Sequence, residues 1–171
     1  MNKIIDQTFK VAIYLRLSKE DDDLSCSSGA KSESNSISNQ RKLIYDFMKS
    51  HPELELYDEY KDDGKSGSNF DRAEFQRMMK DIEAGKVNCV IVKDQSRFGR
   101  DYIDVGKYKE KIFPKLGVRF ITINEGYDSL SATSSDDLAF TINSFVYDFY
   151  IRDISTKIRT NLTAKKQNGE Y

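Results

Sequence analysis

Short apolar segments alternate with longer amphipathic ones along the first two thirds of the chain, and this alternation constrains the fold more than any other feature. Strands are expected at residues 11–18, 54–60, 87–93 and 118–123, with helices between them. Strands joined by helices run mainly parallel, and the crossovers place helices on both faces of the sheet. We therefore expect an α/β domain with a mainly parallel central sheet of four to five strands flanked by helices.

The first strand, VAIYLRLS, brings polar side chains to one face at its carboxyl end. Alternate residues of a strand point the same way, so Tyr14, Arg16 and Ser18 share this face and apolar residues occupy the other. The carboxyl ends of parallel strands are where open α/β sheets build their sites. An ordinary solvated strand end gives the same pattern, so this segment alone does not decide between the two.

Three further predictions concern strand alternation and the connections. In the second strand, alternation puts Leu54 and Tyr60 on the same face. The helix after the third strand is expected to end near Pro114, because proline interrupts a helix. Residues 19–36 are acidic and then serine-rich, and residues 124–135 are polar, so both segments are expected to be flexible loops.

The composition excludes several classes of protein. The 171 residues are 38% hydrophobic and 32% charged, which suits a globular domain with an extensive surface. No apolar run approaches the roughly 20 residues that cross a bilayer, and the N-terminus is too short and too charged for a signal peptide. Cys26 and Cys89 form neither a disulfide framework nor a zinc site, so a cytoplasmic protein is expected. Asp21, Asp22 and Asp23 are expected to be solvated, because hard cations need ligands in a fixed geometry.

The last part of the chain predicts one long helix. From residue 136 apolar residues recur at spacings of three and four, and neither proline nor glycine interrupts them before residues 168–169. We expect the widely apolar first half to pack against a partner subunit and the basic second half to meet a polyanion. A surface helix with a solvated end is the simpler alternative. The basic residues of the second half are Arg152, Lys157, Arg159, Lys165 and Lys166.

Arginine is the residue type that gathers near the expected strand ends. A guanidinium stays charged and matches two phosphate oxygens at once, so several converging guanidinium groups indicate a phosphate site. A serine among them suggests a covalent phosphoserine intermediate. His51 is the only histidine and is expected at the surface rather than in a catalytic triad. The absence of P-loop and GxGxxG motifs argues against nucleotide binding. The net charge of −1 means that any polyanion contact must be local.

Five segments together carry a resemblance to a known family. YLRLS, SNSISNQRK, DDGKSGSNFDR, VIVKDQSRFGRDY and FPKLGVRFITIN occur in the order seen in serine recombinases, and they look most like the large ones of transposons and conjugative elements. The resemblance implies a resolvase-like catalytic domain at residues 1–135. It implies, at residues 136–171, a helix that forms a dimer interface and then contacts DNA. It also implies site-specific DNA recombination without a metal or any other cofactor.

The resemblance assigns roles residue by residue. Ser18 matches the nucleophile, which attacks a DNA phosphodiester and becomes linked to a 5′-phosphate. The matching active-site arginines are Arg16, Arg72, Arg97 and Arg100. The matching polar residues around them are Tyr14, Gln40, Asp63, Ser66 and Lys93. The implied partners are double-stranded DNA and further copies of the chain, which form a homodimer and then a homotetramer on two DNA sites.

The chain also departs from the family pattern, and two alternatives stay open. Family members usually carry an apolar residue where Gln95 stands and often Asp where Ser96 stands. The chain ends after the long helix, so we expect a catalytic-domain fragment of a longer protein, with weak DNA affinity on its own. One alternative is a catalytically inactive, dimerising DNA-regulatory module. The other is a doubly wound phospho-acceptor domain in which Asp94 is the acceptor.

Overall fold

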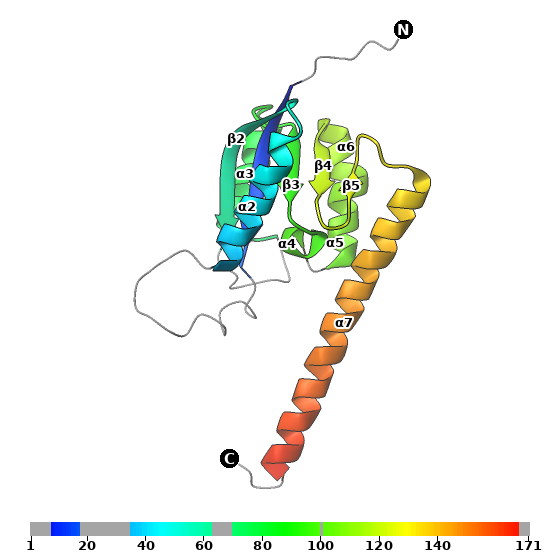
Figure 1. Cartoon of the computed structure of the whole chain (residues 1–171). Coiled ribbons are helices and arrows are strands. Elements are labelled where there is room, and N and C mark those ends of the chain that lie inside the picture. The colour runs from blue at the N-terminus through cyan, green and yellow to red at the C-terminus, as the bar shows by residue number, and fades with distance from the viewer. Residues whose placement is uncertain (1–7, 18–34, 63–69, 100, 168–171) are drawn as a thin grey trace, which may run out of the picture.

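A single mixed sheet forms the centre of the molecule. The computed structural model describes residues 8–17, 35–62, 70–99 and 101–167. Within these ranges the sheet has five strands in the order β2-β1-β3-β4-β5 (Figure 1). They are β1 (Phe9–Arg16), β2 (Leu54–Asp62), β3 (Cys89–Val92), β4 (Arg119–Thr122) and β5 (Tyr127–Asp128). The first four strands pair in parallel, which confirms the prediction from the sequence, and β5 is antiparallel to β4.

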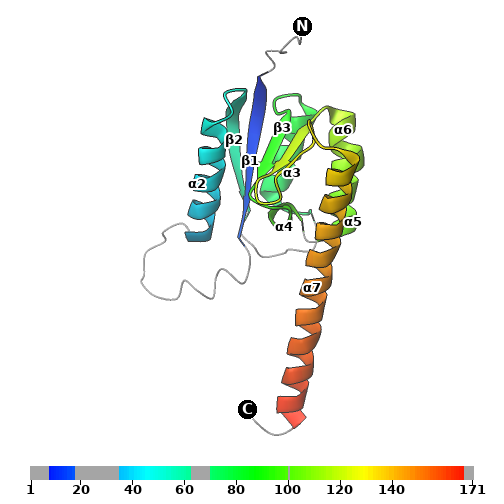
Figure 2. The same cartoon turned by 45° about the vertical axis from the view of Figure 1, so that its right-hand side comes forward.

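One face of the sheet is covered by α2 (Asn35–Lys49) (Figure 2). Ile37 and Ile44 of this helix are fully buried and pack in one cluster with Ile13 and Leu15 of β1. The odd-numbered residues of β1 therefore face α2, as the alternation predicts. Its even-numbered residues face the other side.

The opposite face of the sheet carries the larger, mostly aromatic part of the core. α3 (Ala73–Glu83) buries its apolar side against this face, with Phe75 fully enclosed. Phe98 and Phe120 join it, with a ring-centroid distance of 5.0 Å between these two. Tyr14 of β1 lies in the same cluster, 5.7 Å from the Phe75 ring and edge-on to it. Edge-to-face packing of this kind is the arrangement that aromatic rings favour.

The helical segment after β3 is longer than the sequence predicts. It comprises α4 (Gln95–Phe98), α5 (Tyr102–Lys107), the π-helical η1 (Tyr108–Ile112) and α6 (Phe113–Leu116). The expectation that Pro114 ends the helix is wrong. Pro114 stands in the first turn of α6, directly after the π-helical η1, so the regular α-helical hydrogen bonds are already interrupted at this point. The helix ends instead at Gly117, whose φ of 66° is the left-handed conformation common after a helix.

The expected alternation in β2 is also wrong, because the strand contains a bulge. Val11 and Ala12 of β1 pair with Leu56 and Asp58, so that Tyr57 is the extra residue. An extra residue reverses which face each later side chain meets. Leu54 consequently packs on the α2 side, whereas Tyr60 packs on the α3 side.

Residues 124–135 are not merely a loop, because they include the short strand β5. Arg119 of β4 holds Asp128 of β5 through two hydrogen bonds, 3.0 Å from Nε and 2.7 Å from Nη2. Paired, parallel hydrogen bonds between a guanidinium and a carboxylate are among the strongest side-chain contacts. They fix a segment whose composition alone suggests flexibility.

The last described element is α7 (Ser134–Gln167), the long helix predicted from the sequence. Its first turns are tied to the domain, because Phe140 is buried against Tyr127 and Asp137 accepts a hydrogen bond from Lys109 at 2.7 Å. The rest of α7 extends beyond the edge of the sheet at which the parallel strands end (Figure 1 and Figure 2). Among the described residues, no helix has the length and apolarity that a membrane span requires.

Candidate active site

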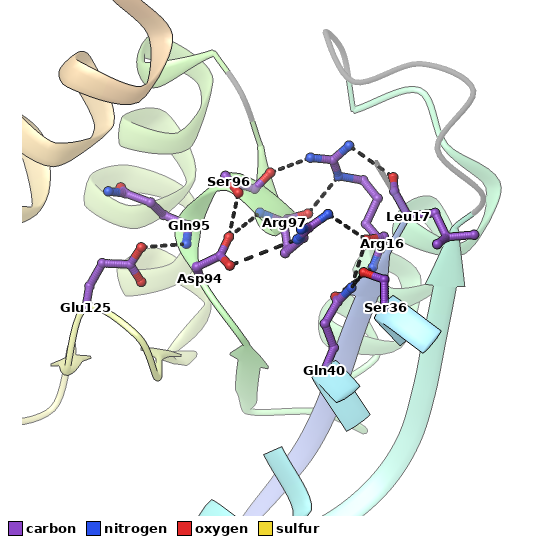
Figure 3. Close-up of polar contacts among 9 residues, drawn as sticks. All are labelled: Arg16, Leu17, Ser36, Gln40, Asp94, Gln95, Ser96, Arg97 and Glu125. Carbon is purple, nitrogen blue, oxygen red and sulfur yellow. Dashed lines mark hydrogen bonds and ion pairs between the residues drawn. The ribbon is translucent and has the colours of Figure 1, made fainter. Parts of the chain in front are cut away.

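The carboxyl ends of β1 and β3 meet at α4, the four-residue helix that carries Arg97 (Figure 3). Asp94 begins this helix. Its carboxylate accepts hydrogen bonds from the Arg97 backbone N–H at 3.1 Å and from the Ser96 hydroxyl at 2.5 Å. A carboxylate at this position satisfies N–H groups that have no partner within the helix. Asp94 therefore fixes the turn from which Arg97 projects.

Arg16 is the last residue of β1, and its side chain is enclosed. The residue is 1% exposed, and its guanidinium donates to backbone carbonyl oxygens of α4. Nε donates to the carbonyl of Arg97 at 3.0 Å, and Nη2 donates to the carbonyl of Ser96. Carbonyls at the end of a short helix lack partners within the helix, and Arg16 supplies them. Its charge thus holds α4 against the end of β1.

Arg97 is the more accessible of these two arginines. Its Nη1 donates to the Arg16 carbonyl at 3.4 Å, and its Nε lies 4.0 Å from a carboxylate oxygen of Asp94. The Arg97 side chain is 15% exposed, so a group from outside can reach it. Two like charges are held side by side here because carbonyl oxygens and one carboxylate surround them.

Gln40 of α2 closes this site from the opposite face of the sheet. Its side-chain amide donates to the Arg16 carbonyl at 3.2 Å and to the Ser36 hydroxyl at 3.2 Å. The Arg16 N–H lies 3.4 Å from the amide oxygen of Gln40. Gln40 is fully buried, and it fixes the backbone of β1 at Arg16, two residues before position 18.

A second arginine network lies on the α3 side, built from Arg72, Tyr14 and Asp62. Arg72 Nη1 donates to the Tyr14 hydroxyl at 2.7 Å and to the Phe98 carbonyl at 3.2 Å. The Tyr14 hydroxyl donates to Asp62 at 2.8 Å. Asp62 also accepts the backbone N–H of Phe75 at 3.0 Å, in the first turn of α3. Burial, above all, raises the pKa of Tyr14, which keeps its hydroxyl protonated as a donor.

The described residues thus bring together part of the set expected from the sequence. Five of the expected residues lie around the carboxyl ends of β1 and β3 and are linked by hydrogen bonds to one another or to α4. They are Tyr14, Arg16, Gln40, Arg72 and Arg97. Lys93, also in the expected set, is half-buried at the end of β3. The remaining expected residues, which lie outside the described ones, are Ser18, Asp63, Ser66 and Arg100.

The basic residues expected to contact DNA all lie on α7. Lys157 is exposed and pairs with Asp153 one turn earlier, at 2.7 Å. For the other four, the structure describes the helical backbone but not the side chains; they are Arg152, Arg159, Lys165 and Lys166. The described residues hold no group of three or more His, Cys, Asp and Glu that could bind a metal, and Asp21, Asp22 and Asp23 lie outside them.

Sequence reasoning missed two carboxylates in this region. Asp62 lies two residues after the buried Tyr60, so strand alternation places it on the side of Tyr14 and could have identified it. Glu125 follows β4 and accepts the backbone N–H of Gln95 at 3.2 Å. Burial raises the pKa of Glu125. No sequence pattern signals this long-range contact.

Comparison with known proteins identifies the family. The sequence model of the resolvase N-terminal domain family matches residues 11–171, which is nearly the whole chain. The chain therefore belongs to the resolvase N-terminal domain family. A search of curated proteins gives no match.

Solved structures agree with this assignment. The chain is similar to the N-terminal catalytic domain of TP901-1 integrase, with a TM-score of 0.61 and 27% identity over 84% of this chain and 97% of that one. It is similar to a resolvase family site-specific recombinase from Streptococcus pneumoniae, with a TM-score of 0.57 and 27% identity over 94% and 99%. The C-terminal catalytic domain of ISC1926 TnpA, an IS607-like serine recombinase, gives a TM-score of 0.54 over 94% and 99%; at 20% identity this is a likeness of fold alone.

Proposed function

We propose that this chain is the catalytic domain of a serine site-specific recombinase, in which Ser18 cleaves DNA through a covalent 5′-phosphoserine. The observation that carries the proposal is the position of Arg97. Its guanidinium donates to the carbonyl of Arg16, two residues before Ser18, at 3.4 Å, and it remains partly exposed. A cation next to the expected nucleophile can bind the phosphate that the nucleophile attacks.

The reaction is a phosphoryl transfer without net hydrolysis. The Ser18 Oγ–P bond forms while the bond from phosphorus to the 3′ oxygen of the DNA breaks. The serine hydroxyl loses its proton, and the leaving 3′ oxygen gains one. The phosphoserine keeps the energy of the diester, so rejoining needs neither ATP nor a metal ion. Arg97 and Arg100 stabilise the charge that develops on the phosphate oxygens.

Arg16 and Arg72 have a supporting role in the proposed mechanism. They are 1% and 7% exposed, and both donate to carbonyls of α4. Together they hold the turn of Arg97 against β1 and α3. Tyr14 and Gln40 belong to the same support, and Asp63, Ser66 and Lys93 complete the proposed set around the phosphate.

DNA contact and assembly are assigned to α7. The second half of α7 extends from the same end of the domain as the candidate site. It carries five basic residues, which are Arg152, Lys157, Arg159, Lys165 and Lys166. Guanidinium and ammonium groups along such a helix suit a phosphate backbone. A double-stranded DNA partner is therefore proposed.

The apolar side of α7 supports self-association. On a helix, residues 138, 142, 145 and 149 share one side, opposite the buried Phe140. All four are apolar and between 52% and 65% exposed. An exposed apolar stripe of this kind marks an interface. We assign it to a second copy of the chain, in a homodimer that forms a homotetramer when two DNA sites are brought together.

A denaturing gel tests the function directly. Nicked DNA bearing the recombination site of the protein is incubated with the wild type and with Ser18→Ala, and DNA joined to protein is scored. The proposal requires an adduct with the wild type and none with Ser18→Ala. Specific DNA binding without an adduct would favour the DNA-regulatory module instead.

A further inference from the structure

The contact between α4 and α7 contains a buried polar pair, Gln95 and Ser144. Gln95 is 2% exposed and Ser144 is 7% exposed. The Ser144 hydroxyl is hydrogen-bonded to the side-chain amide of Gln95, across 49 positions of sequence. The surrounding contacts of α7, such as Phe140 with Tyr127, are largely apolar. This hydrogen bond is therefore a directional link from α7 to the helix of Arg97.

One orientation of the Gln95 amide gives each hydrogen bond of Ser144 a donor of its own. Ser144 also lies 3.0 Å from the Phe140 carbonyl, and a hydroxyl has only one proton to donate. Meanwhile Nε2 of Gln95 is buried without a partner among the described residues. If the amide is turned over, Nε2 donates to Ser144 Oγ, and Ser144 donates to Phe140. Oxygen and nitrogen of an amide are assigned from such networks.

Gln95 is held at its backbone as well as at its side chain. Its N–H donates to Glu125 at 3.2 Å, and its side chain points away from Arg97 (Figure 3). The space beside the pair is a cavity of about 10 Å³ lined in part by Tyr102 and Tyr147, which is room for one water molecule at most. Gln95 is thus fixed between Glu125 and α7, with little freedom to adjust.

We propose that Gln95 is a positioning residue, which ties the turn of Arg97 to α7 through its hydrogen bond to Ser144. Only one residue separates Gln95 from Arg97, and both belong to the same helical turn. Ser144 lies on the side of α7 opposite the exposed apolar stripe. The inference rests on the proposed function, because the position of Arg97 affects a reaction only if the chain cleaves DNA.

The link itself is tested without DNA by NMR on the 171-residue chain. The signals of the Arg97 backbone N–H and side-chain Nε–H are compared in the wild type, Gln95→Leu and Ser144→Ala. Both substitutions are expected to move these signals, and the double variant should move them no further, because one bond is lost in each case. Asn143→Ala, an exposed neighbour on α7, is the matched control and should leave them unchanged. Unmoved Arg97 signals in Gln95→Leu and Ser144→Ala would overturn the link.

The effect on the reaction is tested by the rate of adduct formation and the stability of the same variants. Each single substitution is expected to slow adduct formation about tenfold or more, because a small misplacement of a catalytic group is costly. Replacing both polar partners by apolar ones restores stability. A positioning role predicts that the double variant stays slow although it is stable. Recovery of the rate together with stability would overturn the inference.

Failure of the proposed function can be distinguished from failure of the positioning role of Gln95. If the wild type forms no adduct, the proposed function fails, whereas the NMR comparison still decides the Gln95–Ser144 link. If the wild type reacts and the single variants react at its rate, the recombinase assignment stands and the positioning role of Gln95 is wrong.

Discussion

The guanidinium of Arg72 donates to the hydroxyl of Tyr14 at 2.7 Å, deep between β1 and α3. The same hydroxyl donates to Asp62 at 2.8 Å, so one phenol joins a cation to a carboxylate that lie on different elements. Burial of this kind demands that each polar group has a partner. The Tyr14 hydroxyl therefore couples the end of β1 to the first turn of α3, next to the turn of Arg97.

Removal of the Tyr14 hydroxyl should destabilise the domain. In Tyr14→Phe, a buried guanidinium and a buried carboxylate each lose a partner, and we expect a loss of about 1–3 kcal/mol in the free energy of unfolding, measured with urea. Tyr45→Phe is the matched control, because its hydroxyl bonds Glu59 at 2.8 Å where both residues are half-buried and water can replace it. A loss in Tyr14→Phe no larger than in the control would contradict this account.

Arg97→Lys should react slowly while it folds normally. An ammonium group cannot reproduce the two-pronged contact of a guanidinium with phosphate. We expect the rate of adduct formation to fall by about 10²-fold or more, the cost of losing one preorganised donor. Arg77→Lys is the control, because that guanidinium pairs with Asp58 and Glu74 on the surface of α3. Near-normal cleavage by Arg97→Lys would remove Arg97 from the phosphate site.

Charges placed on the apolar stripe of α7 should prevent self-association. The chain is expected to associate weakly at high concentration in sedimentation velocity. The double variant Ile142→Glu with Phe149→Glu should sediment as a monomer, because it places charges on the proposed interface. Both side chains are more than half exposed in the isolated chain, so the fold should be kept. Leu130→Glu, which alters an apolar residue that is 65% exposed and lies outside α7, should associate like the wild type. A wild type that is strictly monomeric would argue against the stripe as an interface.

The anchor of α7 should make stability depend on pH. The hydrogen bond from Lys109 holds the pKa of Asp137 below its usual range, with a further contribution from Tyr127. A carboxyl whose pKa is lowered in the folded state stabilises the protein fully above the unfolded pKa of about 4. This stabilisation disappears as the pH falls through the folded-state pKa.

Asp137→Asn is consequently expected to be less stable than the wild type at pH 7, and the difference should shrink below about pH 4. Urea unfolding at both pH values measures it. Asp71→Asn, which removes an exposed carboxylate outside this contact, should differ little from the wild type at either pH. A difference for Asp137→Asn that persists undiminished in acid would show that the Lys109 contact is not its cause.

Much of the fold was predictable because it depends on local periodicity. The four parallel strands and α7 follow from apolar spacing that secondary structure converts directly into buried faces. The predictions that failed for β2 and β5 depend on a particular side-chain contact or on a single extra residue. The short strand β5 is held to β4 by the hydrogen bonds between Asp128 and Arg119. The residues of β2 after the bulge face the other side of the sheet because Tyr57 is an extra residue. Neither leaves a periodic trace in the sequence.

For the described part of the candidate site, the sequence indicated which arginines lie near the strand ends but not the hydrogen bonds that they make. Arg16 ends β1 and Arg97 follows β3, and the carboxyl ends of parallel strands lie at the same edge of a sheet. The sequence did not indicate that Arg16 would be enclosed and would bond to carbonyls of α4, because backbone acceptors have no sequence signature. The same reason explains why Glu125, which contacts the Gln95 N–H, was not anticipated.

Mass spectrometry of the covalent adduct tests the central proposal most directly. The protein is incubated with nicked DNA that carries its recombination site, the DNA is digested, and the modified peptide is identified. The account predicts a nucleotide joined through its 5′-phosphate to Ser18. A 5′-phosphate on another residue, or a 3′-phosphate linkage, would contradict it.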